Sequence, residues 1–188
     1  MSEMKALPLA ILLILAAGCS PAPSSAAHAP APAAAPPSAT KEYRPPAKSF
    51  LSYKTPPEWI SEEVGDNMRK AQYRIPDRAG KAAAASLTFF SMSPQSVDTI
   101  VNYWRDKMGG ADANVAQIKG AACPTTLVDI AGEYTGDSPS IANALFLGAI
   151  VEAGERTWYL KFVGPAATVE GWREAYVEML KGLKPTQQ

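Results

Sequence analysis

The stretch NALFLGAIVEAGERTWYLKFVGP, residues 143–165, constrains the fold of this chain more than any other. Its first half, Leu145 to Val151, is almost wholly apolar, which is typical of a central strand with both faces covered. A turn around Gly154 follows, and the next residues alternate between two faces. Trp158, Leu160 and Phe162 form one set, and Tyr159, Lys161 and Val163 form the other. The stretch therefore predicts a β-hairpin inside a covered sheet.

Three more segments have the patterns of strands. Residues 67–76 (NMRKAQYRIP) read as a strand that ends at a proline. Residues 82–92 (AAAASLTFFSM) alternate between two faces, and the PDRAGK sequence before them supplies a hairpin turn with Gly80. Residues 125–134 (TTLVDIAGEY) are expected to form another strand. The polar segment 110–123 has no clear pattern.

Two segments have helical periodicity. The first has Ser93 as its expected N-cap and Pro94 at its first helical position, and it ends at Gly109-Gly110. The second is expected to start at Thr168. The apolar residues at helical spacing are Val97, Ile100, Val101, Trp104 and Met108 in the first, and Val169, Trp172, Tyr176, Leu180 and Leu183 in the second. The order of strands, helix, strands, helix predicts an α+β fold, an α/β/α sandwich in which helices flank an antiparallel β-sheet.

The first 18 residues have the features of a lipoprotein signal peptide. Residues 6–17 form an apolar run that is too short to span about 30 Å of hydrocarbon. The sequence Leu15-Ala16-Ala17-Gly18-Cys19 resembles the bacterial lipobox, with the leucine one position earlier than usual. The resemblance implies cleavage between Gly18 and Cys19 and acyl chains on Cys19 that anchor the protein in a membrane. The alternative is an ordinary secretory signal peptide with an incidental Cys19.

Residues 19–48 comprise the expected lipidated cysteine and a linker rich in proline, alanine and serine. The linker has almost no large apolar side chains, so ordering it would bury too little surface to offset its conformational entropy. Ser20 follows the cysteine, where lipoproteins retained in the Gram-negative inner membrane typically have aspartate. By that resemblance, we expect the protein at the periplasmic face of the outer membrane. The folded domain is expected at residues 49–188.

Composition and residue types exclude several kinds of function. The chain has 18 Lys plus Arg and 18 Asp plus Glu, so it lacks the basic excess of most nucleic-acid binders. Its single histidine, His28, lies in the linker, so the domain has neither a Ser-His-Asp triad nor a histidine-based zinc site. Cys123, alone in the domain, is expected to be buried and inert rather than a redox centre. We therefore expect no cofactor, no metal site and no catalytic residue.

Four side chains are candidates for binding. Trp59 lies in a proline-rich loop, where its indole either caps the edge of the core or forms an exposed anchor. Arg69 and Arg105 would form an anion-binding pair only if the fold brings them together. Lys161 is expected to pair with a carboxylate on a neighbouring strand, to extend past a covering helix, or to bind a ligand. The other tryptophans, Trp104, Trp158 and Trp172, are expected in the core.

Several segments resemble the Mog1/PsbP-like family, in particular its bacterial lipoprotein members. They are YKTPPEW, NMRKAQY, VNYWR and RTWYLKFVGP, and the most specific part is Trp158 to Pro165. The resemblance spans residues 50–183 and implies an antiparallel sheet with helices on both sides. Members include a Ran-binding nuclear protein and an extrinsic photosystem II subunit, whereas most bacterial lipoprotein members have no established activity. No binding motif of the eukaryotic or plant members is matched, so the resemblance implies a fold and no site residues.

Three functions agree with these features. The first is a lipid-anchored binding or accessory domain without catalytic activity, docked to an envelope protein complex. The second is a small-ligand-binding or carrier protein with a pocket between the sheet and a helix, lined by tyrosine and tryptophan. The third is a hydrolase based on carboxylates alone, which requires two acids among Asp129, Glu133 and Asp137 to converge in a cleft.

Overall fold

The computed structural model of the chain describes residues 51–137, 139–153 and 156–186, which belong to one compact unit. The expected signal peptide and the linker lie outside these residues, as does the hairpin turn at Gly154. Cleavage after Gly18 and acylation of Cys19 therefore stay predictions.

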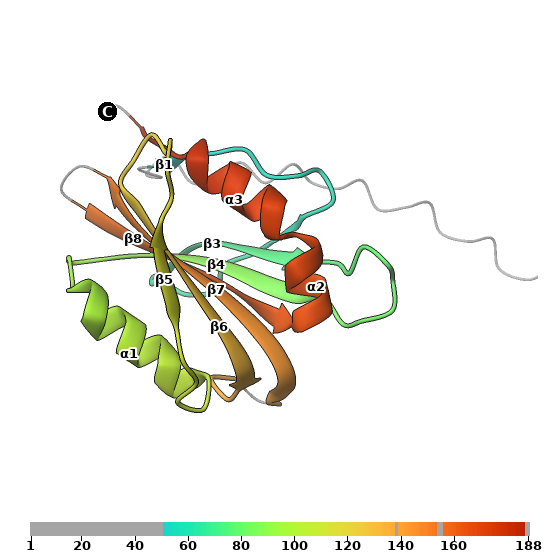
Figure 1. The fold of residues 1–188 in the computed structure, drawn as a ribbon. Coiled ribbons are helices and arrows are strands. Elements are labelled where there is room, and N and C mark those ends of the chain that lie inside the picture. The colour runs from blue at the N-terminus through green and yellow to red at the C-terminus, as the bar shows by residue number, and fades with distance from the viewer. Residues whose placement is uncertain (1–50, 138, 154–155, 187–188) are drawn as a thin grey trace, which may run out of the picture. The chain divides into compact units, whose positions relative to one another are not determined.

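Seven antiparallel strands form the main sheet, in the order β2-β3-β4-β8-β7-β6-β5 (Figure 1). They are β2 (Ile60–Glu62), β3 (Arg69–Ile75), β4 (Ala85–Met92), β5 (Asn114–Gln117), β6 (Thr125–Tyr134), β7 (Ile141–Ala153) and β8 (Arg156–Pro165). A second sheet pairs β1 (Leu51–Ser52) with β9 (Lys184–Pro185). The helices are α1 (Val97–Lys107), α2 (Ala166–Gly171) and α3 (Arg173–Lys181). Every strand pair is antiparallel, which confirms the α+β class.

The β7–β8 hairpin lies in the middle of the sheet, as the apolar run at residues 145–151 predicts. Leu147 and Phe162 are partners in the register of the two strands, and both are fully buried. Residues of β7 are buried on both faces, since Leu147 belongs to one hydrophobic cluster and Phe146 to the other. Burial on both faces explains why this strand lacks the polar alternation of a half-exposed strand.

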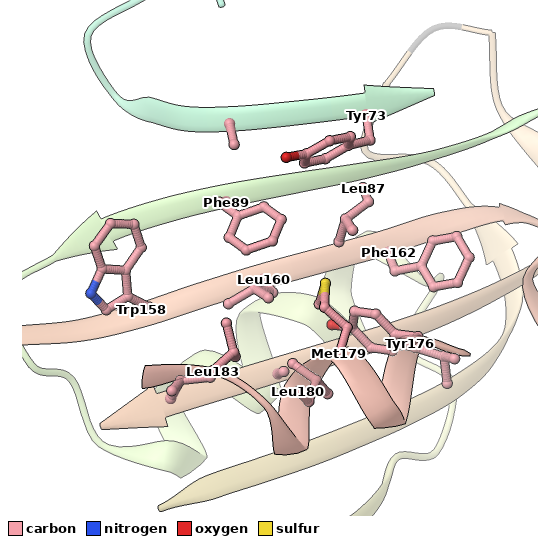
Figure 2. Close-up of a cluster of buried hydrophobic side chains, with 14 of the residues drawn as sticks. Tyr73, Leu87, Phe89, Trp158, Leu160, Phe162, Tyr176, Met179, Leu180 and Leu183 are labelled. Carbon is pink, nitrogen blue, oxygen red and sulfur yellow. The ribbon is translucent and has the colours of Figure 1, made fainter. Parts of the chain in front are cut away.

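Helices cover both faces of the sheet (Figure 1). On one face, α2 and α3 enclose the larger hydrophobic cluster, where the ring centroids of Phe162 and Tyr176 lie 5.2 Å apart (Figure 2). On the other face, α1 packs Ile100 and Trp104 against residues of β6, β7 and β8. The prediction of an antiparallel sheet flanked by helices is confirmed.

The start of α1 differs from the prediction. Its N-cap is Ser96, whose Oγ accepts a hydrogen bond from the backbone N–H of Thr99 at 3.2 Å. The backbone N–H of Gln95 donates to Tyr159 Oη at 3.0 Å, which holds the preceding residues in a loop. The prediction of Ser93 as N-cap was wrong. Ser93 and Ser96 both suit the position, and only the hydrogen bond between Gln95 and Tyr159 of β8 distinguishes them.

Two further elements differ from the prediction. The expected C-terminal helix is interrupted at Trp172, whose φ and ψ are −112° and 3°. The indole N–H of Trp172 donates to the carbonyl oxygen of Pro76 at 2.7 Å. The bend therefore places this ring against the loop that follows β3. The segment without clear pattern contains β5, a four-residue edge strand whose side chains are all exposed.

Candidate functional site

An open hollow of about 420 Å³ lies between α1 and the β4–β8 strand pair. Its lining is mostly apolar and consists of Met68, Phe90, Met92, Gln95, Thr99, Ile100, Tyr103, Trp104, Tyr159 and Lys161. The volume falls in the range of about 300–1,000 Å³ that is typical of small-molecule sites. The exposed apolar side chains around it make this hollow our candidate site.

Exposed apolar side chains concentrate around this hollow. Met68, Met92 and Tyr103 are 66%, 41% and 56% exposed, and they are three of the five large hydrophobic residues exposed in the described part of the chain. Clustered exposed apolar groups mark interaction sites more often than isolated ones do. The unbranched thioether side chains of methionine also adapt to ligands of different shape.

The floor of the hollow changes from apolar to polar along the β4–β8 pair. Phe90 is the register partner of Tyr159, and the next pair on the same face is Thr88 with Lys161. Beyond Lys161 lies a smaller hollow of about 260 Å³, whose lining includes Arg74, Tyr134 and Asp137. Lys161 therefore stands at the boundary between an apolar and a polar part of one sheet face.

Trp104 forms part of the wall because Gly148 leaves room for it. A Cβ at Gly148 would lie 2.3 Å from Cζ3 of the Trp104 ring, so no larger residue fits there without a shift. Gly148 is also the register partner of Lys161. The glycine thus sets how closely α1 approaches the sheet beside the lysine.

Lys161 is held by two groups from the end of β6 and the loop after it. Its Nζ donates to Tyr134 Oη at 2.9 Å and lies 3.6 Å from Asp137 Oδ2. Tyr134 Oη in turn donates to Asp137 Oδ2 at 2.9 Å. Burial lowers the pKa of Lys161 and outweighs the opposite effect of Asp137, and it raises the pKa of Tyr134. The expected carboxylate partner is present, although it comes from a loop rather than a strand.

This pKa shift gives a prediction for stability. Because the pKa of folded Lys161 lies below its ordinary value of 10.5, the unfolded state binds more protons between these two values, and stability contributed by this group rises with pH there. We expect Lys161→Met to be at least as stable as the wild type at neutral pH, with a difference that shrinks as the pH approaches 10.5. Urea denaturation of both proteins across this range measures the difference.

Asp137 stays solvated in this variant, since its side chain is 68% exposed, and Tyr134 keeps its hydrogen bond to it. If Lys161→Met were clearly less stable than the wild type at neutral pH, the burial of the ammonium group would not be unfavourable for folding, and the prediction would be contradicted.

The structure does not bring Arg69 and Arg105 together in a pair. Arg69 forms an ion pair with Asp66 at 2.9 Å, and Arg105 Nε donates to the carbonyl oxygen of Ala111 at 3.0 Å. Arg69 lies instead near Lys161, whose pKa it lowers further through charge repulsion. Each arginine is thus held by partners of its own, and the condition for an anion-binding pair is not met.

Of the two positions expected for Trp59, at the edge of the core or exposed as an anchor, the structure shows the first. It is 5% exposed and packs against Phe162 and Trp172, with centroid distances of 6.1 and 6.0 Å. It is not an exposed anchor. The other three tryptophans are buried as predicted, namely Trp104, Trp158 and Trp172.

The candidate carboxylates lie on different faces of the sheet. Asp129 forms an ion pair with Arg173 of α3 at 2.7 Å, whereas Asp137 contacts Lys161 on the α1 side. Glu133 is exposed. The three acids therefore do not converge in one cleft. Cys123 is buried as predicted, and burial raises the pKa of its thiol.

No sequence signal points to the rim of the hollow as a group. Met68, Met92 and Tyr103 come from three separate segments, and only the fold brings them together. Tyr103 alone carries a hint, since it is a large aromatic residue outside the apolar stripe of its helix. Among the described residues, no helix is long and apolar enough to cross a membrane, and no group of three metal-ligating side chains occurs.

Comparisons with known proteins do not assign a family. No family model and no curated protein matches the sequence. The fold is similar to a Pseudomonas aeruginosa protein of unknown function, at 11% identity and a TM-score of 0.48, over 70% of this chain and 99% of that one. A Bacteroides thetaiotaomicron VPI-5482 protein is similar at 10% identity and a TM-score of 0.46, over 74% of this chain. The match spans 46% of that second protein.

Proposed function

We propose that this chain is a lipid-anchored envelope protein whose domain binds a small ligand with an apolar body in the hollow between α1 and the β4–β8 pair. The observation that supports this proposal most is the concentration of exposed Met68, Met92 and Tyr103 around one hollow. A ligand seated there removes apolar surface from water, and each Å² contributes about 25 cal/mol. The domain acts by binding and has no catalytic role.

The pocket expected from the sequence for a ligand carrier has tyrosine and tryptophan between the sheet and a helix. Tyr103, Trp104 and Tyr159 line the hollow in that arrangement. Docking to an envelope protein complex is the alternative function, and the described residues contain no feature that favours it over a small ligand. We therefore place the small ligand first.

Membership of the Mog1/PsbP-like family is part of this proposal. It is supported by the segments of sequence similarity around Trp158 to Pro165 and by helices on both faces of an antiparallel sheet. The anchor at Cys19 and the position at the periplasmic face of the outer membrane are supported by the lipobox and by Ser20. Mass spectrometry of the native protein tests the anchor, since an unmodified Cys19 would exclude it.

Filling the hollow should weaken binding. Thr99 is an exposed residue of α1 that lines the hollow, so Thr99→Trp is expected to weaken binding of the neutral fluorescent probe N-phenyl-1-naphthylamine at least about tenfold. Asn102 is exposed on the same helix and does not line the hollow, so Asn102→Trp is the matched control. The measurement is fluorescence titration of the full chain carrying Cys19→Ser, which is purified without acyl chains.

Two results would contradict the proposal. One is a wild-type chain that does not bind the probe. The other is equal binding by the Thr99→Trp and Asn102→Trp variants, because the probe would then occupy another part of the molecule.

A further inference from the structure

We propose that the ligand of this hollow is an anionic amphiphile, whose acid group binds the ammonium group of Lys161 while its apolar body lies between Phe90, Trp104 and the methionine rim. This inference rests on the proposed function, because it names the class of ligand for the same site. It assigns Lys161 as the residue that selects for a negative charge.

The first support is that protein groups satisfy the ammonium group of Lys161 only in part. An ammonium group has three donors. Within the described residues, one donates to Tyr134 Oη at 2.9 Å, and the remaining polar contact is the ion pair with Asp137 at 3.6 Å. Asp137 is 68% exposed and hence well hydrated, so this pair is a weak one. Donor capacity remains for a ligand oxygen.

The second support is the sign of the surrounding charge. Arg69 and Lys107 both lie close enough to Lys161 to lower its pKa by repulsion, and Asp137 opposes them. Arg69 has Asp66 as a partner of its own. An anion at Lys161 would therefore meet net attraction, and the partly dehydrated setting strengthens it.

The third support is the position of Lys161 along the floor. The Phe90–Tyr159 pair precedes the Thr88–Lys161 pair on the same face. The hydroxyl of Tyr159 already accepts a hydrogen bond from Gln95, so this residue presents its ring to the hollow as fixed apolar surface. A ligand that enters past Met92 and Tyr103 covers apolar surface first and brings its terminal group to the lysine.

The fourth support is that the position of the lysine is unfavourable for its charge. Its side chain is 22% exposed, and its burial disfavours the charged form. A methionine would fill the same space without that cost. A residue that is unfavourable for folding and lines an apolar hollow is better explained by binding than by stability.

The test compares four probes of equal chain length that displace N-phenyl-1-naphthylamine from the full chain carrying Cys19→Ser. The probes are decanoate, decyl phosphate, decanol and decyltrimethylammonium. We expect the two anions to displace the dye at concentrations at least about tenfold lower than decanol, and the cation to be the weakest. A stronger effect of decyl phosphate than of decanoate would support the same anion site with a phosphate as head group.

Variants then assign the preference to Lys161. Lys161→Met is expected to lose the preference for the anions over decanol, whereas Lys161→Arg keeps it. Lys119→Met is the matched control, because Lys119 is exposed beyond β5 at the far edge of the sheet. If none of the probes displaces the dye, the proposed function fails. If decanoate and decanol are equally effective, or if Lys161→Met keeps the preference, the proposed function stands and this inference is overturned.

Discussion

Replacing Phe162 with alanine is expected to lower the free energy of unfolding by about 3–5 kcal/mol. Phe162 lies on β8, the central strand, and its side chain is fully buried. Its ring centroid lies 5.2 Å from that of Tyr176 on α3 and 6.1 Å from that of Trp59 in the loop before β2. The substitution therefore leaves a cavity where the sheet, a helix and a loop meet. Since domains of this kind are stable by only about 5–15 kcal/mol, a substantial part of that stability would be lost.

Urea denaturation measures this effect, and the matched control is Tyr103→Ala. Tyr103 is 56% exposed, so removing its ring should change stability by no more than about 0.5 kcal/mol. Equal losses in the two variants would mean that the core is not organised around β8.

Gly148→Ala is expected to cost about 1–3 kcal/mol and to weaken binding in the hollow. The added Cβ would lie 2.3 Å from Cζ3 and 2.6 Å from Cε3 of Trp104, so the ring or the whole of α1 must move. Either movement changes the wall of the hollow that Trp104 forms. We therefore expect a lower denaturation midpoint together with weaker binding of N-phenyl-1-naphthylamine.

Two comparisons sharpen this prediction. Gly171→Ala is the control, because a Cβ there has no neighbour among the described atoms within 4 Å. In a Trp104→Leu background, Gly148→Ala should cost clearly less, since the smaller side chain leaves room for the methyl group. A full cost in that background would show that the clash with Trp104 is not the cause.

The sequence was sufficient for elements whose side chains have a regular burial pattern. The predicted division of β4 and β8 into two sets of side chains is correct, because Leu87 of β4 and Leu160 of β8 lie in the larger hydrophobic cluster, whereas Tyr159 lies in the smaller one. The apolar stripe of α1 was also correct, with Ile100, Val101 and Trp104 buried. Local periodicity reports burial well when an element has a single buried face.

Features that depend on distant contacts were not predicted. The helical pattern continues through Trp172, and only the hydrogen bond from its indole to Pro76, almost a hundred residues earlier, accounts for the bend. Strand β5 is an exposed edge strand of four residues, and none of its side chains is buried, so it has no alternation of apolar and polar residues to reveal it. Lys161 was identified as a candidate by alternation, whereas its partners Tyr134 and Asp137 are known only from the fold.

The short pairing of β1 with β9 has a consequence for how the protein can be handled. Leu51 lies opposite Pro185 and Ser52 opposite Lys184, so the path of the chain into the domain and its path out are adjacent. A fluorescent protein or affinity tag joined after β9 would be held close to the point of entry. Such a fusion reports on the surroundings of that one corner of the molecule, and a label meant for the neighbourhood of the hollow belongs on α1 instead.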